Sequence, residues 1–161
     1  MNSMSSNNSY SFDSLVDLPT YKAGVTQATA YRLLKKFTDD CIQEHGITTT
    51  QWFIIGTIYD AGDRGIGITQ LSRMVDTNVP YITNTLNLLE NKGLVEREVR
   101  GNDSRAKIVR IAPDSIKTVK AIEADLRKKM RETIYQNITP EELRAYLTVL
   151  YKLSNSLEQF N

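Results

Sequence analysis

The hydrophobic period of this sequence changes from helical to extended at a single glycine, Gly93. The stretch before it, residues 80–92, repeats apolar side chains at helical spacing, and the stretch after it alternates apolar and polar side chains over residues 94–99. A second alternating run covers residues 108–111, and the residues between the two runs tolerate positive φ, which predicts a β-hairpin. The predicted core face of the helix consists of Ile82, Thr85, Leu86 and Leu89.

A shorter helix precedes this segment. Thr69 is the expected N-cap of a helix that runs through Leu71, Met74 and Val75, and residues 76–78 then turn the chain. Pro80 falls in the first turn of the following helix, where a missing amide hydrogen costs nothing. A short helix, a turn, a second helix and a two-stranded hairpin follow one another in a winged helix-turn-helix.

The outer face of the second helix is uncharged, whereas a solvated helix face usually carries Lys and Glu. Asn side chains can form paired hydrogen bonds with an adenine edge in the major groove, and the Thr methyl group can contact thymine. The alternative is a polar surface that simply lacks charge. The face consists of Pro80, Thr83, Asn84 and Asn87, with Tyr81 and Leu88 on its edges.

Positive charge concentrates in the hairpin. Residues 97–110 contain five basic and two acidic side chains, a net +3, whereas the whole chain carries only +1. Such a hairpin beside a neutral, hydrogen-bonding helix suits DNA phosphates and the minor groove. Asp103 could hold Arg105 and point it outward from the tip of the hairpin; the alternative is a surface ion pair worth about 0–1 kcal/mol.

The flanking segments are also helical. An apolar stripe predicts a first helix over about residues 23–46, and Thr48 with Gln51 forms a potential capping box for the next. Residues 116–134 predict a long helix, and a last one begins at Thr139 with proline and glutamate in its first turn. Its apolar arc is broad enough for two contact surfaces, which favours a dimer interface; the alternative is deep packing within one chain.

Specific motifs in these segments resemble the MarR family of regulators. They are residues 71–75, the helix-glycine-strand element 89–97, and the wing pattern of Asp103 and Arg105 separated by one residue. The resemblance implies a mainly α fold with a small β-wing, in which residues 48–112 form the winged lobe. It also implies that helices at about 23–46 and 114–160 form a dimerisation region, so that residues 21–161 make up the family domain.

The resemblance extends to individual positions. It implies a recognition helix with Arg commonly found where this chain has Asn84. The implied base-reading residues are Tyr81, Thr83, Asn84 and Asn87; the implied wing residues are Asp103, Arg105 and Lys107; and the residues implied to position the DNA backbone are Thr69, Arg73 and Asn78. The aromatic side chains Tyr31, Trp52 and Tyr59 could line a pocket for a small aromatic or phenolic effector, although such residues are more often core.

The expected function is a homodimeric repressor that binds a palindromic operator in double-stranded DNA and is released by a small molecule or stress signal. The alternative is a winged-helix module that binds protein instead of DNA. An enzyme is not expected, since the chain has one histidine and no cofactor-binding loop. No cofactor or metal is expected either.

Cys41 and His45 lie four residues apart and could share a helix face. Two ligands are too few for a typical zinc site, and the chain has no second Cys or His. Some family relatives sense hydroperoxides through a cysteine of the first helix, although Cys41 also fits an apolar stripe.

The N-terminal residues 1–20 begin with a Ser- and Asn-rich stretch and predict a disordered tail or a docking arm. They lack the charged start and apolar run of an export signal, which favours the cytoplasm. The longest apolar run, residues 52–55, is too short to cross a membrane, so no membrane partner is expected.

Overall fold

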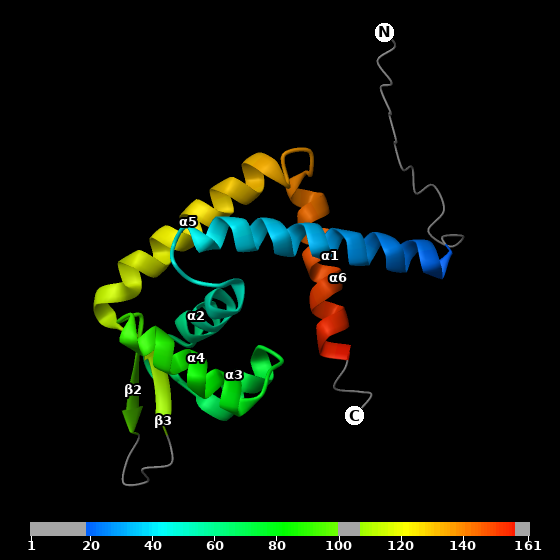
Figure 1. Cartoon of the computed structure of the whole chain (residues 1–161). Helices are drawn as coiled ribbons and strands as arrows, with labels where there is room; N and C mark the ends of the chain where they lie inside the picture. Colours follow the sequence, from blue (N-terminus) through cyan, green and yellow to red (C-terminus); the bar gives the residue numbers. More distant parts are fainter. Residues whose placement is uncertain (1–18, 100–106, 157–161) are drawn as a thin grey trace. The chain divides into compact units, whose positions relative to one another are not determined.

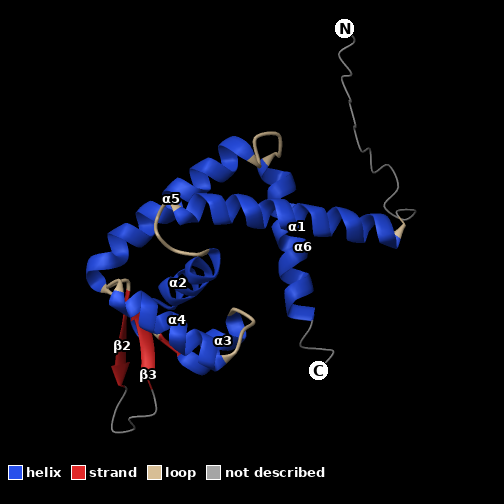
Figure 2. Ribbon diagram, in the orientation of Figure 1, coloured by secondary structure: helices blue, strands red, loops and turns tan. Residues whose placement is uncertain are grey.

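The computed structural model describes residues 19–99 and 107–156, which form helices and three short strands (Figures 1 and 2). The chain divides into two compact units after Phe37. The first unit contributes the described residues 19–37, which include most of helix α1 (Thr20–Gln43). The second unit holds the end of α1 and all later elements.

The second unit contains the predicted helix-turn-helix and wing. Its first three helices are α2 (Thr49–Ala61), α3 (Ile68–Met74) and α4 (Val79–Asn91). An antiparallel sheet of order β1-β3-β2 consists of β1 (Ile66–Gly67), β2 (Val95–Val99) and β3 (Lys107–Ile111). In Figure 1, β2 and β3 lie side by side next to these helices. The predicted mainly helical fold with a small β-wing is confirmed.

Helix α2 begins with the predicted capping box. The Gln51 amide donates to Thr48 Oγ1 at 3.2 Å, and the Thr48 amide donates to Gln51 Oε1 at 3.1 Å. Two amides that the helix leaves without an internal partner are thereby satisfied. The helix buries Ile54, Ile55 and Ile58 completely, which anchors it in the core of the lobe.

Helix α3 corrects one expectation from the sequence. Its N-cap is Gly67, which makes no side-chain cap hydrogen bond, and Thr69 lies inside the helix at its second position. The helix starts early because Ile66 and Gly67 pair with β3, and the chain enters the helix directly at the end of that pairing. Within α3, Leu71 is fully buried, whereas Met74 is 61% exposed.

The change from helix to strand occurs at Gly93, which has φ +71° and follows the end of α4. A left-handed residue of this kind is readily supplied by glycine. The hairpin then pairs Arg97 with Val109 in antiparallel register. At the other edge of β3, Gly65 has φ +63°, and a Cβ there would lie 2.9 Å from the Val109 carbonyl oxygen. Only a residue without a side chain fits this close approach.

Two long helices complete the second unit. α5 (Ile116–Thr133) buries Val119, Ile122 and Leu126, as its predicted stripe requires. α6 (Pro140–Ser156) begins at the predicted cap, where the Glu142 amide donates to Thr139 Oγ1 at 3.2 Å. Within the described chain no residue of α6 is buried, so deep packing of this helix inside its own chain is wrong. None of the helices in residues 19–99 and 107–156 is long and apolar enough to cross a membrane.

Candidate nucleic-acid interface

Helix α4 separates its two faces as predicted. Ile82, Leu86 and Leu89 have no exposed surface, and Thr85 is 5% exposed. The opposite face is open: Asn84 and Asn87 are exposed, and Thr83 is half-buried. The apolar side chains along its edges, Val79, Tyr81 and Leu88, are 40%, 43% and 53% exposed.

The amino end of α4 is fixed by Asn78. Its side-chain oxygen accepts a hydrogen bond from the Tyr81 amide at 2.9 Å, which makes it a conventional N-cap. Asp76, in the preceding turn, has φ +48° and reverses the chain between α3 and α4. This turn and cap set the angle at which the open face of α4 is presented.

Thr83 already uses its hydroxyl proton within the helix. Its Oγ1 donates to the Val79 carbonyl oxygen at 2.9 Å. The Thr83 carbonyl in turn accepts a hydrogen bond from Arg97 Nη2 at 3.2 Å. Thr83 can therefore offer a partner its methyl group and an oxygen lone pair, but not a free O–H donor.

Arg97 connects the hairpin to α4. Besides the Thr83 carbonyl, its guanidinium lies 3.5 Å from Glu90 Oε2, and its side chain is only 17% exposed. The sequence analysis grouped Arg97 with the basic residues of the hairpin that could face DNA. In the structure its side chain contacts α4 instead. Arg110 is also paired within the protein, because it forms an ion pair with Glu98 on the neighbouring strand.

The predicted wing residues lie largely beyond what the structure describes. Asp103 and Arg105 fall in residues 100–106, outside the described residues, and the side chain of Lys107 at the start of β3 is also not described. Thr69 and Arg73 are exposed and lie four residues apart on α3, which puts them on one face of that helix.

A polar junction joins the α1–α2 loop to α5 and to the end of α4. His45 Nε2 lies 2.8 Å from Asp125 Oδ2, and Lys129 Nζ donates to Glu44 Oε2 at 2.7 Å. Lys92, the C-cap of α4, donates to the Gly46 carbonyl oxygen. Hydrogen bonds from Lys129 and then His45 hold the pKa of Asp125 below its usual value.

Cys41 lies near this junction and is 8% exposed. Burial raises the pKa of its thiol, and the opposing charge of Lys129 only partly offsets this effect. A raised pKa and low exposure disfavour the reactive thiolate that a redox sensor needs. Among the described residues, no group of three or more metal-binding side chains includes Cys41 or His45.

The comparisons with known proteins agree with this arrangement. Residues 45–106, which span α2 to the hairpin, match the model of a family described as the MarR family. Over these residues the chain is similar to the MarR family. The resemblance noted in the helix-glycine-strand element and the wing pattern is therefore confirmed.

Solved structures of MarR-family regulators share the fold. AbsC, a MarR family transcriptional regulator from Streptomyces coelicolor, is similar at a TM-score of 0.75 and 18% identity, over 86% of this chain and 94% of that one. A MepR–DNA complex from S. aureus gives 0.67 and 24%, over 86% and 98%. Wild-type MarR from E. coli in the apo form gives 0.68 and 19%, over 81% and 94%. At these identities the likeness establishes the fold.

The aromatic residues predicted to form an effector pocket fall in different parts of the structure. Trp52 and Tyr59 line an open cleft of about 1240 Å³ between α2 and α5. Lys120 and Arg127 of α5 face the same cleft, as does Asp60 of α2. Tyr31 belongs to the first compact unit and is 64% exposed.

Sequence reasoning did not predict two contacts of this site. Arg97 meets Thr83 across 14 positions, and His45 meets Asp125 across 80. The alternation of β2 does indicate that Arg97 shares a face with buried Val95, and this was the available hint. Sequence reasoning instead grouped Arg97 with the basic residues by charge.

Proposed function

We propose that this chain is a transcriptional regulator that binds double-stranded DNA as a homodimer. The observation that carries the proposal is the open, uncharged face of α4, which presents Asn84 and Asn87 between exposed apolar side chains. Side-chain amides of this kind read base edges in the major groove. The similarity to MepR, which was solved as a DNA complex, supports DNA binding by this chain.

The wing and α3 contribute contacts that do not depend on base sequence. Arg105 and Lys107, with Asp103 orienting the arginine, grip phosphates or the minor groove beside the reading helix. Since Arg97 and Arg110 are paired within the lobe, the hairpin's attraction for DNA depends on its remaining basic residues. Thr69, Arg73 and Asn78 approach the DNA backbone from the helix-turn-helix, and Tyr81 and Thr83 complete the base-facing surface.

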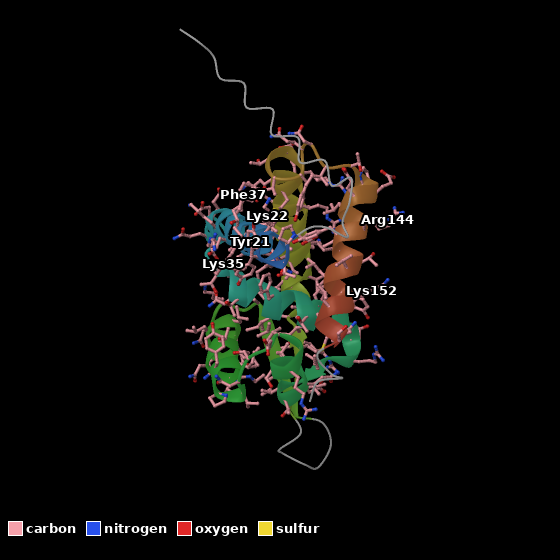
Figure 3. The ribbon with its side chains drawn as sticks, turned by 90° about the vertical axis from the view of Figure 1, so that its right-hand side faces the viewer. Tyr21, Lys22, Lys35, Phe37, Arg144 and Lys152 are labelled. Carbon is pink, nitrogen blue, oxygen red and sulfur yellow. The ribbon has the colours of Figure 1, made fainter. Side chains whose placement is uncertain are left out.

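Self-association uses α6. Tyr146, Leu147, Val149, Tyr151 and Leu153 are between 40% and 70% exposed in the single chain. At 100° per residue, these apolar side chains occupy one broad arc, and Arg144 and Lys152, both labelled in Figure 3, fall on the remaining arc. An exposed apolar surface of this extent marks an interaction site, and a second copy of the chain covers it in our proposal.

A two-fold dimer spaces its recognition helices about 34 Å apart, one turn of DNA, and so reads a palindrome. An effector then acts by changing that spacing. A small aromatic compound bound near Trp52 and Tyr59 would favour a conformation in which the two recognition helices cannot engage DNA together. The effector thereby releases the operator, so the chain acts as a repressor. We place this function in the cytoplasm.

The test is selection of bound fragments from random duplex DNA by the full-length chain, followed by titration of the recovered sequence at several salt concentrations. The proposal is supported if the recovered sequence is a palindrome and if the affinity of the chain for it falls steeply as the salt concentration rises. Arg105→Ala should weaken binding to all sequences and reduce the salt slope by about one charge. Leu153→Arg should yield monomers that bind half-sites weakly. A chain that binds no duplex even at low salt is instead the protein-binding module.

A further inference from the structure

The base-facing surface of α4 contains no charged side chain. From Val79 to Leu89 the helix has neither an acid nor a base, and the first charged residue, Glu90, faces Arg97. Lys92, the nearest basic residue of this segment, is bound to the Gly46 carbonyl at the far end of the helix. The helix therefore offers DNA side-chain amides, apolar groups, the Tyr81 phenol and the Thr83 hydroxyl, whose proton is already engaged.

These groups do not serve all base pairs equally. Guanine presents two acceptors in the major groove and is best read by Arg or Lys, and the cytosine amine is best read by a carboxylate. Adenine presents one acceptor and one donor, which a single Asn amide matches with both of its ends. Thymine adds a methyl group that apolar side chains and the Thr methyl can contact.

The positions of the groups on α4 fit adjacent base pairs. Asn84 and Asn87 are three residues apart, about 4.5 Å along the helix axis, and both are exposed on the same side. The neighbouring Thr83 has its hydroxyl proton committed to the Val79 carbonyl, so it presents its methyl group. Val79, itself 40% exposed, lies on the same edge one turn earlier.

We infer that α4 reads adenine–thymine pairs. Asn84 and Asn87 each bind an adenine edge, and Thr83 and Val79 contact the methyl groups of the paired or adjacent thymines. The operator half-site beneath α4 is therefore composed of A·T pairs, and G·C pairs there are disfavoured because the helix has neither the Arg or Lys that best reads guanine nor the carboxylate that best reads cytosine. This inference rests on the proposed function and specifies its ligand.

The experiment uses the full-length chain and the duplex recovered by selection. In matched duplexes, each adenine under α4 is replaced by deaza-adenine, which lacks the groove-facing ring nitrogen, and each thymine by uracil, which lacks the methyl group. Fluorescence anisotropy at one salt concentration measures the affinity. Deaza-adenine at a contacted pair should weaken binding about 5- to 150-fold, and replacement of the pair by G·C should weaken it as much or more.

Variants assign the contacts to residues. Asn84→Ala and Asn87→Ala should each make the protein insensitive to deaza-adenine at one pair, while both keep the wild-type melting temperature because the side chains are exposed. Asn137→Ala, an exposed amide in the α5–α6 loop, is the matched control and should change neither affinity nor sensitivity. Asn84→Arg should shift the preference at its pair from adenine toward guanine.

The outcomes separate this inference from the proposed function. Recovery of a palindrome whose contacted pairs are G·C, or of an A·T site at which deaza-adenine has no effect, overturns A·T reading while DNA binding stands. Uniform loss of affinity in Asn84→Ala, with sensitivity to deaza-adenine unchanged, also overturns it, because the amide then only positions the backbone. Failure to bind any duplex refutes the proposed function itself.

Discussion

Replacement of Arg97 by methionine tests how the hairpin is fastened to the recognition helix. Methionine keeps much of the apolar stem but removes the guanidinium. The hydrogen bond to the Thr83 carbonyl is charge-assisted and in a poorly exposed setting, so its loss costs about 1.5–3 kcal/mol. The ion pair with Glu90 adds about 0–1 kcal/mol, since Glu90 is 39% exposed and can be hydrated when left alone.

The expected free energy of unfolding of Arg97→Met is therefore about 1.5–4 kcal/mol below that of the wild type. For a chain of this size each kcal/mol corresponds to about 2–4 °C, so the melting temperature should fall by about 3–16 °C. Thermal unfolding followed by circular dichroism at one protein concentration measures the change. Arg131→Met, at an exposed position on α5, is the control and should melt with the wild type.

DNA titration then distinguishes this internal role from a phosphate contact. If Arg97 holds the helix in place, Arg97→Met should leave the salt slope of binding unchanged at temperatures where the variant is folded. A variant that melts with the wild type but loses about one unit of salt slope would show that Arg97 faces DNA. That result would refute the assignment of Arg97 to α4.

Three further expectations concern stability. Thr48→Ala removes the capping box of α2 and should lower the free energy of unfolding by about 1 kcal/mol in urea titrations; an unchanged midpoint would mean that the cap is dispensable. Leu86→Ala empties a fully buried site and should cost about 2–5 kcal/mol by the same assay. Hydrogen bonds from Lys129 and His45 lower the pKa of Asp125, so its stabilising contribution is present above the unfolded value of about 3.9 and is lost as pH falls through the lower folded value. In Asp125→Asn the urea midpoint should therefore depend less on pH in the acid range than it does in the wild type. If the two proteins show the same pH dependence of the midpoint, the ion pair of Asp125 is contradicted.

The features that the sequence predicts correctly are those encoded by near neighbours. The capping boxes at Thr48 and Thr139 involve residues three apart, and Gly93 ends α4 by its own backbone conformation. The core face around Leu86 follows from helical spacing alone. These local rules were enough to predict the order of helices and strands and hence the winged fold.

The features that the sequence does not predict depend on residues far apart in the chain. Thr69 looks like an N-cap, but pairing of Ile66 with β3 starts α3 one residue before it. Arg97 looks like a free cation, but the fold brings it against the carbonyl of Thr83. Charge and helix propensity are properties of a single residue. The contacts that the residue makes depend on which other element of the fold packs against it.

Helix α6 buries none of its 17 residues within the described chain. A helix of this length is only marginally stable in water by itself, so its order depends on the surface that covers it. When that surface belongs to another molecule, helix content becomes a function of total protein concentration through mass action. Dilution should then unfold α6 before the winged lobe melts. The concentration of the protein in a cell would set the fraction of chains that can bind an operator.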